Sequence, residues 1–102
     1  MPLEELSGPI PTAVTTMTSL TNLTLRNNLF TGTIPANMGN LTNLTRLDLQ
    51  SNELTGTIPA SFGNLSQLEW LRLSNNELSG DVPLGVTGLL NLEVLPAPKF
   101  IG

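Results

Sequence analysis

The sequence predicts an α/β repeat solenoid, in which each coil of the chain adds one short strand to a parallel sheet. The first observation behind this prediction is a period of 24 residues that runs through most of the 102-residue chain. The second is a pair of leucines at alternate positions in each period, and the third is a proline that returns once per period. Short strands stacked at a constant spacing pair in parallel, with neighbours about 4.8 Å apart.

The period divides a single domain, 1–102, into three full repeats and two partial ones. The full repeats are 17–40, 41–64 and 65–88, and the partial repeats are 1–16 and 89–102. The columns of the central repeat are Leu41, Leu44, Leu47, Leu49, Asn52, Leu54, Gly56, Ile58, Pro59, Phe62 and Gly63. The apolar columns continue forward to Leu89, Leu92, Leu95 and Ala97. Stacking three or more such units buries a continuous core.

Each column has a physical reason. Leu47 and Leu49 alternate as a strand requires, so both are expected to point inward while Asp48 points outward. The glycine column permits backbone geometry that a β-carbon would obstruct. The proline column fixes φ and is expected at the first position of a short helical or 3₁₀ segment, at Pro11, Pro35, Pro59 and Pro83.

An asparagine column follows the strands, at Asn28, Asn52 and Asn76. It falls where the chain bends inward, and a buried amide there can satisfy backbone groups that the turn leaves unpaired. We expect a structural asparagine ladder.

Composition excludes several classes of function. The formal net charge is −4, which disfavours nucleic acid as a partner. The chain has no cysteine, histidine or tyrosine, so disulfides, thiolate metal sites and the commonest general base are absent. No apolar run reaches the roughly 18 residues of a membrane span, and Met1–Leu6 lacks the basic and apolar parts of a signal peptide. No catalytic residue, metal, cofactor or membrane insertion is therefore predicted, and an enzyme is not expected.

The pattern L-x-x-L-x-x-L-x-L-x-x-N-x-L-x-G-x-I-P resembles the plant-type leucine-rich repeat. Its Ser/Thr-Gly-x-Ile/Val-Pro signature occurs at Ser7–Pro11, Thr31–Pro35, Thr55–Pro59 and Ser79–Pro83. The resemblance implies a right-handed leucine-rich-repeat solenoid with a parallel concave sheet and a 3₁₀ or irregular convex side. It also implies a second short strand near each Ile-Pro, and a receptor-like ectodomain of extracellular or cell-surface origin.

The ends depart from that family, because the cysteine-paired caps usual in its extracellular members are missing. A fragment, a partner that covers the ends, or unconventional caps would each account for this. In register, Pro96 and Pro98 extend a strand begun at Leu95, and we expect them to blunt its open edge as a true terminus. The start in mid-turn reads more like a truncation.

Outward strand positions form columns on the predicted concave face. The first column is Asn22, Arg46, Trp70 and Val94, and the second is Thr24, Asp48, Arg72 and Pro96. Because Trp and Arg are enriched at binding hot spots and the repeat requires neither, we expect partner-binding residues at Arg26, Arg46, Asp48, Trp70 and Arg72. The alternative is a surface ion pair between Arg72 and Asp48, worth roughly 0–1 kcal/mol, with Trp70 lying over the Arg46 stem.

Two weaker signals remain. Sequons for N-glycosylation begin at Asn22, Asn40, Asn43 and Asn64, although repetition of the consensus inflates their number. Thr31-Gly32-Thr33 and Thr55-Gly56-Thr57 would stack two pairs of threonines, a small version of an ice-binding array. The leading function is protein or peptide recognition through the concave face. The alternative is a structural subunit inside a larger assembly that covers the uncapped ends, and ice binding is a remote third.

Overall fold

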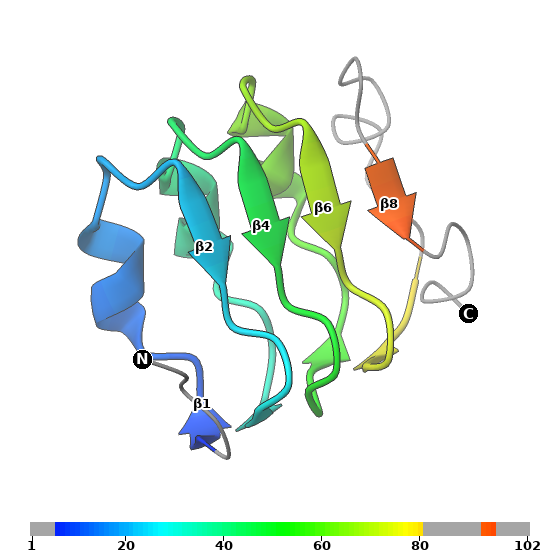
Figure 1. The fold of residues 1–102 in the computed structure, drawn as a ribbon. Helices are drawn as coiled ribbons and strands as arrows, with labels where there is room; N and C mark the ends of the chain where they lie inside the picture. The colour runs from blue at the N-terminus through cyan, green and yellow to red at the C-terminus, as the bar shows by residue number, and fades with distance from the viewer. Residues whose placement is uncertain (1–5, 81–92, 96–102) are drawn as a thin grey trace.

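The computed structural model describes residues 6–80 and the backbone of 93–95. Short strands alternate with 3₁₀ segments along the chain (Figure 1). The strands are β1 Ser7–Pro9, β2 Asn22–Thr24, β3 Leu29–Thr31, β4 Arg46–Asp48, β5 Thr55–Gly56, β6 Trp70–Arg72, β7 Glu77–Leu78 and β8 Glu93–Leu95. The 3₁₀ segments are η1 Thr12–Thr16, η2 Ala36–Asn40 and η3 Ala60–Asn64. In the described part of the chain, no helix has the length and apolar character needed to cross a membrane.

The main sheet is parallel, with the strand order β2-β4-β6-β8. Leu23 pairs with Leu47 and Leu47 with Leu71, so equivalent residues of successive repeats stand side by side. The 3₁₀ segments lie behind this sheet, on the other side of each coil (Figure 1). The predicted solenoid, with a parallel sheet on one side and 3₁₀ turns on the other, is confirmed.

A second set of short strands lies where the chain leaves the main sheet. β1 pairs with β3, β5 pairs with β7, and an isolated bridge joins Thr33 to Thr55. Ser7 pairs with Leu29, which is 22 positions later rather than 24, so neighbouring coils are offset here by two residues. The strand that the family resemblance implied is therefore present, but it ends at Thr31, before the Ile-Pro dipeptide rather than on it.

The last strand departs from the predicted register. Trp70 pairs with Glu93 and Arg72 with Leu95, a spacing of 23 residues, so Val94 does not share the Trp70 column as predicted. The N–H of Trp70 donates to the preceding repeat, and by alternation so does the N–H two residues later. A spacing of 24 would place Pro96, which has no N–H, at that donor position, whereas the observed register supplies Leu95.

The expectation that Pro96 and Pro98 blunt the open edge assumed that their backbone nitrogens face away from β6. In the predicted register, the nitrogen of Pro96 would have faced β6 and not the open side. Residues 96–102, on which that expectation falls, lie outside the described residues.

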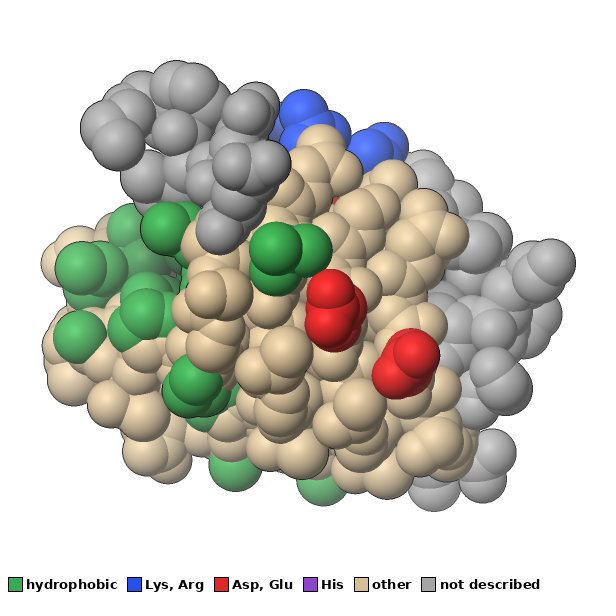
Figure 2. All heavy atoms as spheres, turned by 90° about the horizontal axis from the view of Figure 1, so that it is seen from below, with side chains coloured by type: hydrophobic (Ala, Val, Ile, Leu, Met, Phe, Trp, Pro, Cys, Tyr) green, Lys and Arg blue, Asp and Glu red, His purple; other side chains and the backbone are tan. Residues whose placement is uncertain are grey.

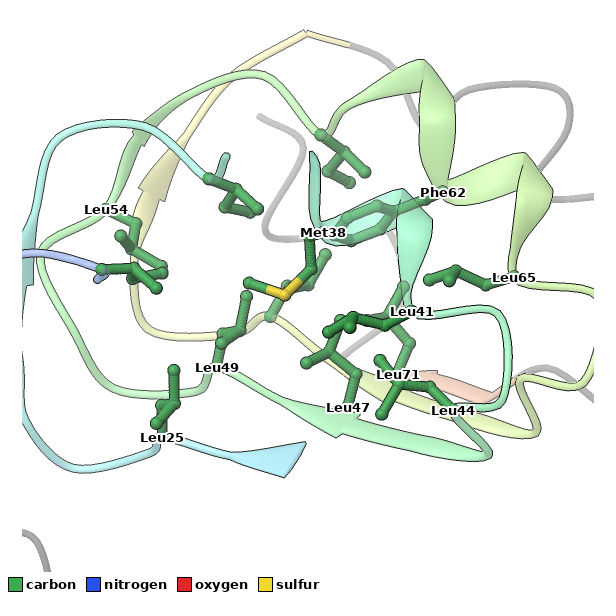
Figure 3. Packing of buried hydrophobic residues seen from close by; sticks show 14 of the residues in the cluster. Leu25, Met38, Leu41, Leu44, Leu47, Leu49, Leu54, Phe62, Leu65 and Leu71 are labelled. Carbon is green, nitrogen blue, oxygen red and sulfur yellow. The ribbon is translucent and has the colours of Figure 1, made fainter. Parts of the chain in front are cut away.

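The core is a column of leucines between the main sheet and the 3₁₀ segments. Leu47, Leu49 and Leu71 point into it from the strand side, and Met38 and Phe62 close it from η2 and η3 (Figure 3). Each of these side chains is fully buried, which contributes about 1.5–3 kcal/mol per side chain. The N-terminal end of the stack is less well covered, since Leu6 and Met17 are exposed there, whereas their counterparts Phe30 and Leu41 in the following repeats are buried.

The proline column stands one position earlier than predicted. Pro35 and Pro59 are the N-cap residues of η2 and η3, with extended ψ angles of 132° and 135°, and the 3₁₀ segments begin at the next residue. The carbonyl of Pro35 accepts the first hydrogen bond of its segment, from Met38 at 3.0 Å. Proline serves here because the cap needs its fixed φ and its carbonyl, and needs no N–H.

Left-handed backbone conformations recur once per repeat in two places. Gly32 and Gly56 have φ of +76° and +80°, which explains the glycine column. The residue before each ladder asparagine is also left-handed, and it is asparagine at positions 27 and 75 but serine at 51. Asparagine adopts this conformation more readily than serine does, so Ser51 is the strained member of its column.

Candidate partner-binding surface

The asparagine column holds the ends of the main strands in place. The amide nitrogen of Asn52 donates to the carbonyls of Leu25 and Leu49, at 3.0 and 3.1 Å. Its side-chain oxygen accepts the N–H of Phe30 at 3.1 Å. Asn76 repeats this arrangement with Leu49, Leu73 and Leu54 one coil further on. These bonds fix where each strand ends and hence where its outward residues stand.

Asn28 occupies the same position in the first full repeat. Its nitrogen donates to Leu25 and its oxygen accepts the N–H of Leu6, both at 3.0 Å. The three asparagines thus link successive coils at one level of the stack.

The outward side chains of β2, β4 and β6, with those that directly follow each strand, form the surface that we term the concave face. Its residues are Asn22, Thr24, Arg26, Arg46, Asp48, Gln50, Trp70, Arg72 and Ser74. All of the arginines in the chain and its single tryptophan lie on this face.

Asp48 is not the exposed contact residue that the sequence led us to expect. It is only 1% exposed, and its carboxylate accepts the N–H of Gln50 at 3.1 Å. Its ion pair is with Arg26, at 3.8 Å between Nη1 and Oδ2, and not with Arg72 as in the alternative interpretation. A buried carboxylate in the middle of a sheet needs such partners to offset the loss of its hydration.

Arg26 therefore has a role that sequence reasoning missed. Its side chain remains 54% exposed, but part of its charge is matched by Asp48. The signal was available, because Arg26 lies two positions beyond the direct partner of Asp48 on the neighbouring strand, within reach of a long side chain.

Trp70 lies against two guanidinium groups. The Cζ atom of Arg72 is 4.3 Å from the centroid of the indole ring, and the Cζ atom of Arg46 is 5.7 Å from it. Both distances are within the range of a cation–π interaction, and the closer partner is Arg72 rather than the expected Arg46. The Nε atom of Arg72 is buried and has no hydrogen-bond partner. Within the described residues, neither Arg46 nor Arg72 has a carboxylate at salt-bridge distance.

Two of the exposed acidic side chains of the described chain lie elsewhere, whereas Glu69 directly precedes Trp70. Glu53 and Glu77 stand on the flank formed by the second set of strands. Figure 2, which looks at this flank from below, shows acidic side chains in the middle of the flank and the basic ones at its upper border. Among the residues described, no group of His, Cys, Asp or Glu side chains could hold a metal ion.

The sequon asparagines occupy different environments. Asn40 and Asn64 are exposed at the ends of η2 and η3, and Asn22 is exposed on the concave face. Asn43 is also exposed, but its amide nitrogen donates to the carbonyl of Thr18 at 2.9 Å.

The expected stack of threonine pairs is not formed. Because the second strands are offset by two residues, Thr33 pairs with Thr55, and Thr55 pairs in turn with Glu77. Thr31 is instead the partner of Pro9. The prediction of two stacked threonine pairs, made from a 24-residue register, is wrong. The repeat period identifies equivalent residues, but it does not determine how far one coil is shifted along the next.

A family model described as leucine rich repeat matches residues 18–78. A search of curated protein sequences found no match. The plant peptide hormone receptor RGFR1 in complex with RGF2 superposes with a TM-score of 0.84 and 39% identity, over 90% of this chain and 15% of the receptor chain.

Two further structures show the range of similar proteins. The LRR ectodomain of the receptor kinase SOBIR1 from Arabidopsis thaliana has a TM-score of 0.81 and 36% identity, over 89% of this chain and 49% of that one. A plant ice-binding protein has a TM-score of 0.77 and 37% identity, over 88% and 31%. The chain thus spans less than half the length of each of these three. From the family match over most of the repeats and the shared fold, this chain belongs to the leucine-rich-repeat family, in its plant-type form.

Proposed function

We propose that this chain is a protein- or peptide-recognition module that binds its partner through the concave face. The observation that carries the proposal is Trp70 within cation–π distance of two guanidinium groups on an otherwise regular sheet. Tryptophan and arginine are the side chains most enriched at binding hot spots, and the repeat places no structural demand on these outward positions.

The relatives support the same function. RGFR1 is a peptide hormone receptor solved with RGF2, and it shares the fold of this chain at 39% identity. We infer by this similarity an extracellular or cell-surface origin and a binding role rather than a catalytic one. The chain covers only 15% of that receptor, so the activity of a longer protein built on it belongs to the proposal as well.

The test is selection of ligands from a displayed library of random peptides, using the wild-type protein as bait. Selected peptides are then titrated against Trp70→Ala and against Thr57→Ala, a matched change on the exposed flank. We expect Trp70→Ala to weaken binding by about tenfold or more, the scale of a hot-spot residue, and Thr57→Ala to leave it unchanged. Circular dichroism controls for folding. Equal binding by folded Trp70→Ala and wild type would contradict a concave site.

A structural subunit is the second candidate, and one observation favours it. Leu6 and Met17 are exposed at the N-terminal end of the stack, where a neighbouring protein could cover them. Sedimentation of the isolated chain separates the two functions. A cooperatively folding monomer supports the recognition module, whereas aggregation that only a partner relieves supports the subunit. No inhibition of ice recrystallisation is expected, since the threonine pairs do not stack.

A further inference from the structure

The arginines of the described chain gather on one surface, while Glu53 and Glu77 lie on another and Glu69 stands directly before β6. Arg26, Arg46 and Arg72 all project from the concave face, although the chain as a whole carries a net charge of −4. The carboxylate in their midst, Asp48, is buried and already bound to a backbone N–H and to Arg26. A face that is locally cationic on an acidic protein attracts an anionic partner and orients it.

The guanidinium groups of Arg46 and Arg72 are arranged to receive such a partner. Each lies within cation–π distance of the Trp70 ring. A guanidinium that lies face to face with an aromatic ring keeps its N–H donors in its own plane, where they can still reach an acceptor at its edge. The forked N–H donors of a guanidinium match the two oxygens of a carboxylate. A guanidinium already held against the ring also loses less side-chain entropy when it binds a ligand.

From this arrangement we infer that the concave face binds an acidic peptide segment, whose Asp or Glu carboxylates pair with Arg46 and Arg72 beside Trp70. The inference rests on the proposed recognition function and specifies the chemistry of its ligand. Arg26 contributes less to this site, because its charge is matched by Asp48 at 3.8 Å.

The experiment titrates the full chain with short oligo-glutamate, oligo-glutamine and oligo-lysine peptides, and follows the fluorescence of Trp70, the single tryptophan. Glutamate and glutamine side chains have nearly the same shape, so the two peptides differ mainly in charge. We expect oligo-glutamate to bind at low salt, to bind more weakly as salt is raised, and to perturb the fluorescence, while the other two peptides have no effect.

The arginines are then replaced one at a time by glutamine. Arg46→Gln and Arg72→Gln are each expected to weaken oligo-glutamate binding by about tenfold, and the matched control Arg26→Gln by less than about threefold. Unfolding in urea verifies that each variant is folded. If Arg72→Gln proves unstable, Arg46→Gln alone tests the inference, because Arg46 is the more exposed of the two.

Each adverse outcome has a distinct meaning. Absence of oligo-glutamate binding, or equal binding of oligo-glutamine, overturns the acidic ligand but leaves concave recognition intact if library peptides still depend on Trp70. Loss of the Trp70 dependence overturns the proposed function itself. Tighter binding of a single-stranded oligonucleotide through the same arginines would replace the acidic peptide with nucleic acid.

Discussion

The side-chain oxygen of Asn52 accepts a hydrogen bond from the backbone N–H of Phe30, a residue of the preceding repeat, at 3.1 Å. The amide nitrogen of the same asparagine donates to Leu25, also in the preceding repeat, and to Leu49 in its own. Asn52, which is only 8% exposed, therefore makes hydrogen bonds within its own turn and links two successive coils.

Replacing Asn52 by alanine should leave the N–H of Phe30 without a partner in the interior, while the carbonyls of Leu25 and Leu49 each keep one donor, from Asn28 and Asn76. We expect a loss of about 1–3 kcal/mol in the free energy of unfolding, measured with urea, because a buried N–H left without a partner keeps its full desolvation cost. Asn43→Ala is the control, since Asn43 is exposed and makes a single bond to Thr18. Similar losses for the two variants would show that the ladder has no special role.

The 3₁₀ segments pack so closely that Gly39 has no room for a side chain. A β-carbon there would lie 2.6 Å from both the carbonyl oxygen and the β-carbon of Ser61 in η3. Gly39→Ala should therefore lower the free energy of unfolding by about 1–3 kcal/mol, as overpacking does. Asn37→Ala, an exposed change in the same segment, should alter it by less than about 0.5 kcal/mol.

A double variant tests the cause of this effect. Gly39→Ala combined with Ser61→Gly removes the clashing Ser61 side chain but keeps its carbonyl oxygen, so only partial recovery is expected. Full recovery would mean that the backbone contact is harmless.

The sequence was sufficient to predict the stacking of the leucines, because a period of 24 identifies equivalent residues and alternation tells which of them face inward. It could not predict how far one coil slips along the next. The offset of two residues between Thr33 and Thr55 is a property of the assembled coils, and the threonine array was mispredicted for this reason. The 23-residue step to Leu95 did have a signal in the sequence, because Pro96 lacks the N–H that a 24-residue register requires.

On the concave face, too, some features could be predicted from the sequence and others could not. The columns of Arg46 with Trp70 and of Asp48 with Arg72 follow directly from the repeat and agree with the strand register. The burial of Asp48 and its pairing with Arg26 did not follow, because they depend on how long side chains cross between strands. Periodicity places a residue on a face but does not decide which neighbour its side chain contacts.

Ser51 offers a stabilising substitution. Its φ is +61°, and the equivalent residues Asn27 and Asn75 show that asparagine fits this position. Ser51→Asn should raise the free energy of unfolding by about 1 kcal/mol, because asparagine tolerates the left-handed conformation better. Thr42→Asn, at an exposed residue without positive φ, is the matched control, with a change within about 0.5 kcal/mol. A destabilised Ser51→Asn would indicate that the serine makes a contact worth more than the strain.

The stacking of Arg72 on Trp70 can be measured independently of any ligand. Trp70→Leu, Arg72→Gln and the double variant form a double-mutant cycle, with unfolding followed by circular dichroism in urea. Since the guanidinium lies 4.3 Å from the ring centroid, we expect a coupling energy of about 0.5–2 kcal/mol. The matched cycle with Arg46→Gln, whose distance is 5.7 Å, should give a smaller value. A larger coupling with Arg46 than with Arg72 would mean that the nearer arginine is not the one that holds the indole in place.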